Sequence, residues 1–178
     1  MNKILLISVI SLICIKAMSQ TNENIFNVRS IYFEIKHSRR IPNNKISVNI
    51  NFKKECTVKL KSTPLIDNEQ WQYTKIDTSF IISKDKLEDI KLSLEKINPN
   101  DFLRDKEYSF KDGYTATLEY GGLGGDISYS FRSPNSRTET RGLNKYLCSC
   151  ALILETAGFS KGDVSRFLRL KTPPQGCD

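Results

Sequence analysis

The chain has 178 residues, of which 39% are hydrophobic and 26% are charged, so it can build one hydrophobic core of ordinary size. Its 27 lysine and arginine residues outnumber 20 acidic residues, which gives a formal net charge of +7. The basic residues are dispersed and form no stripe interleaved with aromatic residues, which argues against nucleic-acid binding and leaves an acidic protein partner compatible.

Residues 1–19 have the three parts of a secretory signal peptide. Lys3 precedes an apolar run over residues 4–15, and small side chains occupy positions 17 and 19, which a signal peptidase reads. The apolar run is too short to span a bilayer as a helix. We therefore expect an exported chain, periplasmic or extracellular, without a stable membrane anchor.

Removal of this peptide leaves a mature chain that begins at or near Gln20. Lys3 and Lys16 are the charged residues removed with it, so the net charge falls by two to +5. We expect residues 20–178 to form a single α+β domain.

Residues 27–83 show the period-2 alternation of β-strands. Strands are predicted within residues 31–35, 46–52, 56–61 and 71–82, and a turn at residues 42–44 joins the first two. Such alternation indicates an antiparallel sheet with one solvated face and helices on the other.

A helix is predicted after Ser83, which is a favourable N-cap, and it ends before Pro99. A short helical turn around Phe102 and Leu103 follows. The apolar stripe that would pack this helix on the sheet consists of Leu87, Ile90, Leu94 and Ile97.

Residues 114–120 and 127–131 alternate like two strands of a hairpin, joined by the glycine-rich segment 121–125. Phosphate-binding glycine loops run from a strand into a helix, whereas both flanks here are strands. We therefore predict a flexible hairpin tip at residues 121–125.

The longest segment with a helical period covers residues 136–158, with Ser136 and Glu139 as a capping box and Gly158 at its end. Ser160 and Asp163 begin a last, short helix. The predicted fold is α+β, with two layers: an antiparallel sheet of about six strands and helices packed on one face.

Four cysteines remain after the signal peptide, in a compartment that permits disulfides: Cys56, Cys148, Cys150 and Cys177. Alternation points Cys56 inward, where it could meet Cys150 on the apolar side of the long helix. Cys148 lies on the opposite side of that helix and would pair with Cys177. Four cysteines allow three pairings, and buried free thiols are the alternative.

No catalytic or metal-binding motif is visible. The single histidine, His37, lies in a basic segment that we expect at the surface, and a Cys-x-Cys spacing is too narrow for a typical zinc site. Glu119 and Asp126 flank the glycine segment and could mimic a glycosidase pair, but paired carboxylates are common on a polar sheet face. We expect no enzymatic activity, no metal and no organic cofactor.

The polar face of the sheet is the candidate for partner binding. A small exported domain without catalytic residues fits an inhibitor or immunity-type protein, which would block a secreted or periplasmic enzyme or toxin by docking on its surface. Hydroxyl, amide and guanidinium groups supply the face: Ser47, Asn49, Asn51, Thr115, Thr117, Ser128, Ser130 and Arg132. The predicted contact residues are Glu119, Gly121, Gly122, Leu123, Gly124, Gly125, Asp126 and Arg132.

Three alternatives remain open. The polar face could simply be the solvated side of a sheet. The chain could be a small-ligand or glycan-binding module of the cell envelope that stacks its ligand on Trp71, Tyr73, Tyr114 and Tyr120. A structural role in the envelope is the third alternative.

Overall fold

The structure is a computed structural model that describes residues 28–38, 43–52, 55–64, 75–107, 113–122, 125–171 and 177. The predicted signal peptide lies outside these residues. Within them, no helix combines the length and the apolar character needed to cross a membrane.

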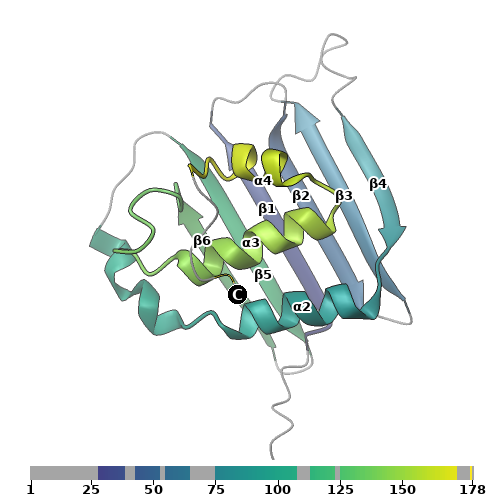
Figure 1. Cartoon of the computed structure of the whole chain (residues 1–178), viewed down its shortest axis with the longest axis horizontal. Helices are drawn as coiled ribbons and strands as arrows, with labels where there is room; N and C mark the ends of the chain where they lie inside the picture. The colour runs from purple at the N-terminus through teal and green to yellow at the C-terminus, as the bar shows by residue number, and fades with distance from the viewer. Residues whose placement is uncertain are drawn as a thin grey trace, which may run out of the picture.

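The strands form one six-stranded antiparallel sheet with the order β4-β3-β2-β1-β5-β6 (Figure 1). The first four strands follow one another as a meander, and β5 returns to pair with β1 at the centre. The bounds are β1 (Ser30–His37), β2 (Asn43–Phe52), β3 (Cys56–Pro64), β4 (Ile76–Ile81), β5 (Tyr114–Gly122) and β6 (Gly125–Arg132).

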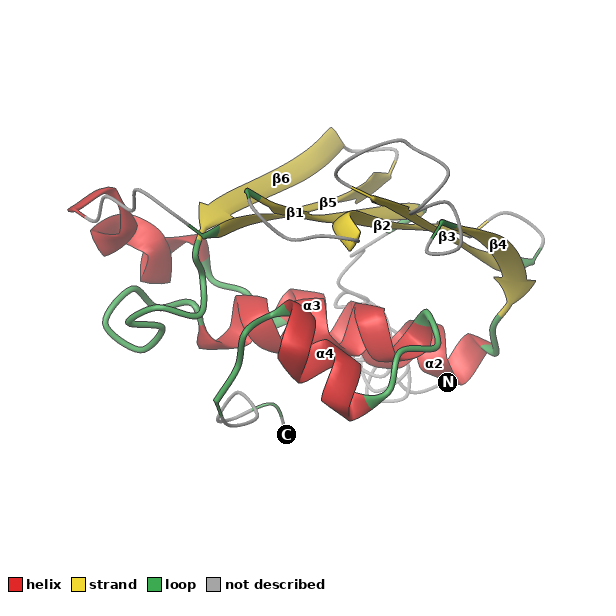
Figure 2. Ribbon diagram, turned by 90° about the horizontal axis from the view of Figure 1, so that it is seen from above, coloured by secondary structure: helices red, strands yellow, loops and turns green. Residues whose placement is uncertain are grey.

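Three α-helices of the described chain cover one face of this sheet and leave the other without a helix (Figure 2). They are α2 (Lys84–Glu95), α3 (Asn144–Thr156) and α4 (Lys161–Phe167), and a 3-10 helix, η2 (Pro99–Glu107), joins α2 to the second pair of strands. The predicted two-layer α+β fold is therefore confirmed.

The alternation of the strand sequences separates the two faces as predicted. Ile31, Phe33 and Ile35 of β1 are fully buried under the helices, whereas Tyr32 and Glu34 between them point to the other face. The other buried hydrophobic residues of this inner face are Ile46, Val48, Ile50, Val58, Leu60, Tyr114, Ala116, Leu118, Tyr120 and Phe131.

The predicted caps of two helices are formed. The Ser83 hydroxyl accepts a hydrogen bond from the Lys86 amide at 3.4 Å at the start of α2, and Ser160 accepts one from the Asp163 amide at 3.2 Å at the start of α4. Each satisfies an amide that has no partner within its helix.

The long helix is shorter than predicted, because residues 136–143 form turns and α3 begins only at Asn144. Arg137 and Gly142 have positive φ angles of 52° and 69°, which a right-handed helix cannot contain. A Cβ atom at Gly142 would collide with the carbonyl group of Asp101, so this close approach to η2 needs glycine. Gly158, with φ at 95°, ends the helix as predicted.

One predicted disulfide is present and one is absent. Cys148 and Cys177 are bonded, with Cα atoms 5.3 Å apart, whereas Cys56 and Cys150 are free thiols. The predicted pairing of Cys56 with Cys150 is wrong because Cys56 begins β3 opposite Phe52, while the helix of Cys150 lies against β5. Two strands, β2 and β1, separate β3 from β5. Burial raises the pKa of the Cys150 thiol.

Candidate functional site

The candidate site is the outer face, which we define as the side of the sheet opposite the helices. Every second strand residue points to this face, and these residues are mainly polar or charged. From β4 to β6, one cross-strand row contains Ser79, Lys59, Asn49, Tyr32, Glu119 and Ser128. The neighbouring row contains Asp77, Lys61, Ser47, Glu34, Thr117 and Ser130.

Short-range hydrogen bonds link side chains across this face. The Thr117 and Ser130 hydroxyl oxygens lie 2.9 Å apart on neighbouring strands, and Ser128 donates to Glu119 at 3.3 Å. Such bonds between exposed groups contribute little stability, but they restrict the conformations of the side chains. The face is therefore partly ordered before any partner arrives.

Glu34 occupies the centre of the outer face on β1. Its carboxylate accepts a hydrogen bond from the Tyr32 hydroxyl at 2.6 Å and forms an ion pair with Lys45 Nζ at 2.7 Å. Burial alone would raise the pKa of Glu34, but the bonds from Lys45 and Tyr32 and the charges of Lys45 and Lys36 lower it below its usual value. Burial and the bond to Glu34 raise the pKa of Tyr32.

The hairpin predicted at residues 121–125 is present, since Gly121 and Gly122 end β5 and Gly125 begins β6. Leu123 and Gly124 lie outside the described residues. A Cβ atom at Gly121 would lie 2.6 Å from the Gly125 carbonyl oxygen and 2.8 Å from the Asp126 Cα atom, so this close backbone approach requires glycine.

Glu119 and Asp126 do not lie directly across from each other. Glu119 pairs with Ser128, and Asp126 pairs with Gly121, so the two carboxylates are diagonal neighbours on the outer face. Asp126 is exposed, and neither carboxylate is set in an enclosed pocket of the kind that tunes a catalytic acid.

Arg132, another predicted contact residue, lies at the other end of β6. It pairs with Thr115, six residues along the strand from Asp126, which corresponds to about 20 Å at the usual rise of a strand. The structure therefore divides the predicted contact residues between the two ends of the outer face.

A hollow of about 230 Å³ lies at the Arg132 end of the outer face. It is open to solvent, and two of its lining residues are cationic. The lining residues are Lys36, Ser38, Gly113, Tyr114, Thr115 and Arg132.

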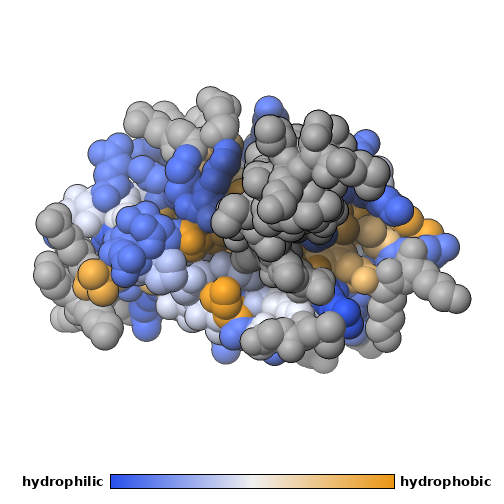
Figure 3. Space-filling model, turned by 90° about the horizontal axis from the view of Figure 1, so that it is seen from below, coloured by the Kyte–Doolittle hydropathy of each residue, from blue (hydrophilic) through white to orange (hydrophobic). Residues whose placement is uncertain are grey.

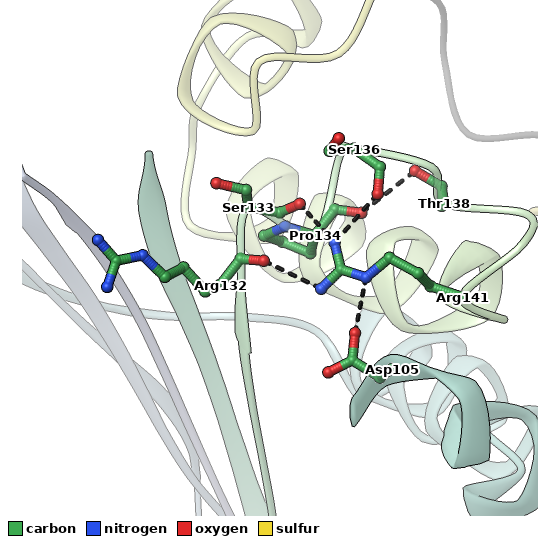
Figure 4. A network of polar contacts seen from close by, with 7 residues as sticks. All are labelled: Asp105, Arg132, Ser133, Pro134, Ser136, Thr138 and Arg141. Carbon is green, nitrogen blue, oxygen red and sulfur yellow. Dashed lines mark hydrogen bonds and ion pairs between the residues drawn. The ribbon is translucent and has the colours of Figure 1, made fainter. Parts of the chain in front are cut away.

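Arg141 fixes the chain that leaves this end of β6 (Figure 4). Its guanidinium is only 1% exposed and forms an ion pair with Asp105 at 2.6 Å. It also donates to the carbonyl oxygens of Arg132 at 3.0 Å, Ser133 at 2.7 Å and Ser136 at 3.0 Å. The sequence pattern does not reveal this group, because Arg141 looks there like one more polar residue of a continuous helix.

The prediction that His37 lies at the surface is wrong. It is 1% exposed on the inner face, because it continues the inward alternation of β1. Its ring stacks on Tyr114 with centroids 5.1 Å apart. The Tyr114 hydroxyl donates to the Leu168 carbonyl oxygen at 2.7 Å, so this aromatic pair ties the sheet to the segment after α4.

The predicted stacking surface for a glycan is not formed by Tyr114 and Tyr120. They are 1% and 4% exposed, respectively, and face the core. Trp71 and Tyr73 lie outside the described residues, as do Arg39 and Arg40 of the basic segment that contains His37.

Exposed apolar side chains are few on the described surface. Phe80 and Ile81 of the edge strand β4 are 36% and 63% exposed, and Figure 3 shows apolar side chains at the end of the molecule where β4 lies. Two such residues are fewer than an apolar docking patch requires.

No three histidine, cysteine, aspartate or glutamate side chains of the described residues gather as a metal site would require. Comparison with known proteins adds no functional residue to this picture: no protein-family model matches the chain, and no curated protein matches its sequence.

Proposed function

We propose that this chain is an exported interaction protein of the inhibitor or immunity type, which docks its outer face on a secreted or periplasmic enzyme or toxin. One observation carries the proposal: a six-stranded sheet presents one broad polar face that no helix of the described chain covers, opposite a fully packed inner face.

The construction of the outer face suits docking. Its side chains stand on strands that are fixed from below by buried residues such as Phe33, Val48 and Leu118. Bonds such as those of Thr117 with Ser130 already restrict some of them. A partner therefore has less side-chain freedom to remove on binding, which lowers the entropic cost of association.

The alternative is a small-ligand or glycan-binding module. This function needs an accessible aromatic surface or an enclosed pocket. Burial of Tyr114 and Tyr120 removes two of the four expected stacking residues, and the hollow beside Arg132 is open to solvent rather than enclosed. Protein docking is therefore the better supported of the two functions.

Affinity capture with a pair of matched variants tests the proposal. Tagged protein would be incubated with envelope and secreted extracts of its own source, and the bound proteins identified by mass spectrometry. Asn49→Arg places a bulky charge on an exposed position of the outer face, whereas Asn100→Arg makes the same change at an exposed position on η2.

We expect one stoichiometric protein that is retained by the wild type and by Asn100→Arg, and at least tenfold depleted with Asn49→Arg. Equal retention by both variants would contradict docking through the outer face. A folded wild-type chain that captures no protein would contradict the proposed function and direct the search to glycans and metabolites, with the emission of Trp71 as the readout.

A further inference from the structure

The basic hollow described above has a defined place in the sheet. Lys36 on β1 and Arg132 on β6 both pair with Thr115 on β5, so they belong to one cross-strand row on the outer face. Their Cα atoms are two strand spacings apart, or about 10 Å. Two long cationic side chains at this separation can reach a single carboxylate placed over Thr115.

The backbone on both sides of the hollow is held firmly. On one side, Arg141 binds the carbonyl oxygens of Arg132 and Ser133, and the Ser133 amide donates to the Tyr114 carbonyl oxygen at 2.7 Å. On the other side, both the amide and the hydroxyl of Ser38 donate to the Gly113 carbonyl oxygen, at 3.1 and 2.8 Å.

The side chain of Arg132 points away from the network that holds its backbone. Figure 4 shows it extending from β6 across the neighbouring strand, on the side opposite Arg141. Its guanidinium is thus presented from a fixed base, which reduces the ordering cost of a bidentate bond to a carboxylate.

Charge is distributed unevenly along the outer face. The row of Lys36 and Arg132 also contains Lys45, whereas Glu119 and Asp126 lie toward the opposite end. Glu34, two residues from Lys36 on the same face, already has its carboxylate engaged by Tyr32 and Lys45. The part of the face made by β1, β5 and β6 therefore has a basic end and an acidic end, which would fix the orientation of a partner with the complementary pattern.

We propose that the hollow between Lys36 and Arg132 is the anchor for an acidic side chain of a protein partner, an inference that rests on the proposed function. Phosphate sites commonly gather several backbone amides around the anion. Here the Ser38 amide is used in a backbone hydrogen bond to Gly113, and two cationic side chains, Lys36 and Arg132, line the hollow. Arg132 supplies the bidentate contact and Lys36 a second charge.

The anchor can be tested without knowing the partner, by NMR titration of the isotopically labelled full chain. The probes are a blocked tri-glutamate peptide, a blocked tri-glutamine peptide and inorganic phosphate. We expect saturable shifts of the Ser38, Gly113 and Thr115 amides with tri-glutamate and none with tri-glutamine.

Arg132→Glu and Lys36→Glu should each weaken tri-glutamate binding at least tenfold. The matched control is Lys59→Glu, which makes the same charge change at an exposed position of the outer face away from the hollow, and it should alter the affinity less than twofold. The amide spectrum of each variant verifies that it is folded.

Three results would overturn the inference: no saturable shift at these amides, an equal loss of affinity in Lys59→Glu, or tighter binding of phosphate than of the peptide. The last result would assign the hollow to a phosphate group. The two proposals can fail separately. If capture is lost with Asn49→Arg but is unaffected by Arg132→Glu, docking through the outer face stands and only the anchor is excluded.

Discussion

The two faces of the sheet are made by the same strands and have opposite properties. On β1, Ile35 is fully buried beneath the helices, while Glu34 next to it belongs to a polar network on the outer face. On β5, Leu118 is buried and Glu119 is exposed. Adjacent residues thus contribute either to the stability of the fold or to the chemistry of its surface.

This separation gives a practical means of testing function. Truncation of inner-face residues removes buried apolar contacts and destabilises the protein. Substitution of exposed outer-face residues usually changes stability little, because water replaces the lost contacts. Variants of the outer face can therefore report on binding while the fold remains intact.

The largest effect is expected where the end of β6 joins the helical layer, at Arg141. Arg141→Ala would leave Asp105 and several carbonyl groups without their partner and should cost about 3–5 kcal/mol of stability in denaturant unfolding. The control is Arg166→Ala, which breaks an exposed pair with Asp163 and should cost less than about 1 kcal/mol. Similar costs for the two variants would mean that the Arg141 network is not essential.

The two layers can be compared directly by truncating one residue in each. Leu154 in α3 is fully buried, and Leu154→Ala should cost about 2–5 kcal/mol. Thr117→Ala on the outer face removes one hydroxyl bond and should cost less than about 1 kcal/mol. Both values would come from denaturant unfolding, and a small cost at Leu154 would show that α3 does not belong to the core.

The disulfide between Cys148 and Cys177 gives a test of the helical layer. Thiol counting on unfolded, unreduced residues 20–178 should find two free thiols, those of Cys56 and Cys150. Cys177→Ser should lower the unfolding free energy by about 2–4 kcal/mol, because it releases a cross-link between residues 29 apart in sequence. Four free thiols, or none, would contradict the pairing.

The smallest effect is the pH dependence that Glu34 contributes. Its pKa is lowered in the folded protein, so its stabilising contribution is present above the pKa of the unfolded chain, about 4.3, and is lost as the pH falls through the folded value. Glu34→Gln should therefore reduce the loss of stability on acidification, measured as unfolding free energy from pH 6 downward. An unchanged pH profile would show that the network with Lys45 is not maintained in solution.

Local patterns predict the layers of this fold because each pattern depends on immediate neighbours. The alternation of Val48 and Asn49 determines which of them faces the core, and the side-chain chemistry of Ser83 and Ser160 determines where two helices begin. The outer face was predictable for the same reason.

Features that depend on lateral position in the sheet were not predictable. The strand alternation and the helical period indicate that Cys56 and Cys150, respectively, face inward, but not that two strands lie between β3 and β5. The hollow likewise requires β1, β5 and β6 to be neighbours, since Lys36 and Arg132 are far apart in sequence. The start of α3 depends on the left-handed backbone of Gly142 and its close approach to Asp101, which no local period reveals.

The most direct test of the outer face as the docking surface is site-specific photo-crosslinking to the captured partner. A photoreactive residue would replace Asn49 or Ser130 on the outer face, and Leu92 or Asp89 at exposed positions of α2. We expect crosslinks from Asn49 and Ser130 and none from the two positions on α2. Crosslinks confined to α2 would contradict the assignment and place the docking surface on the helical layer.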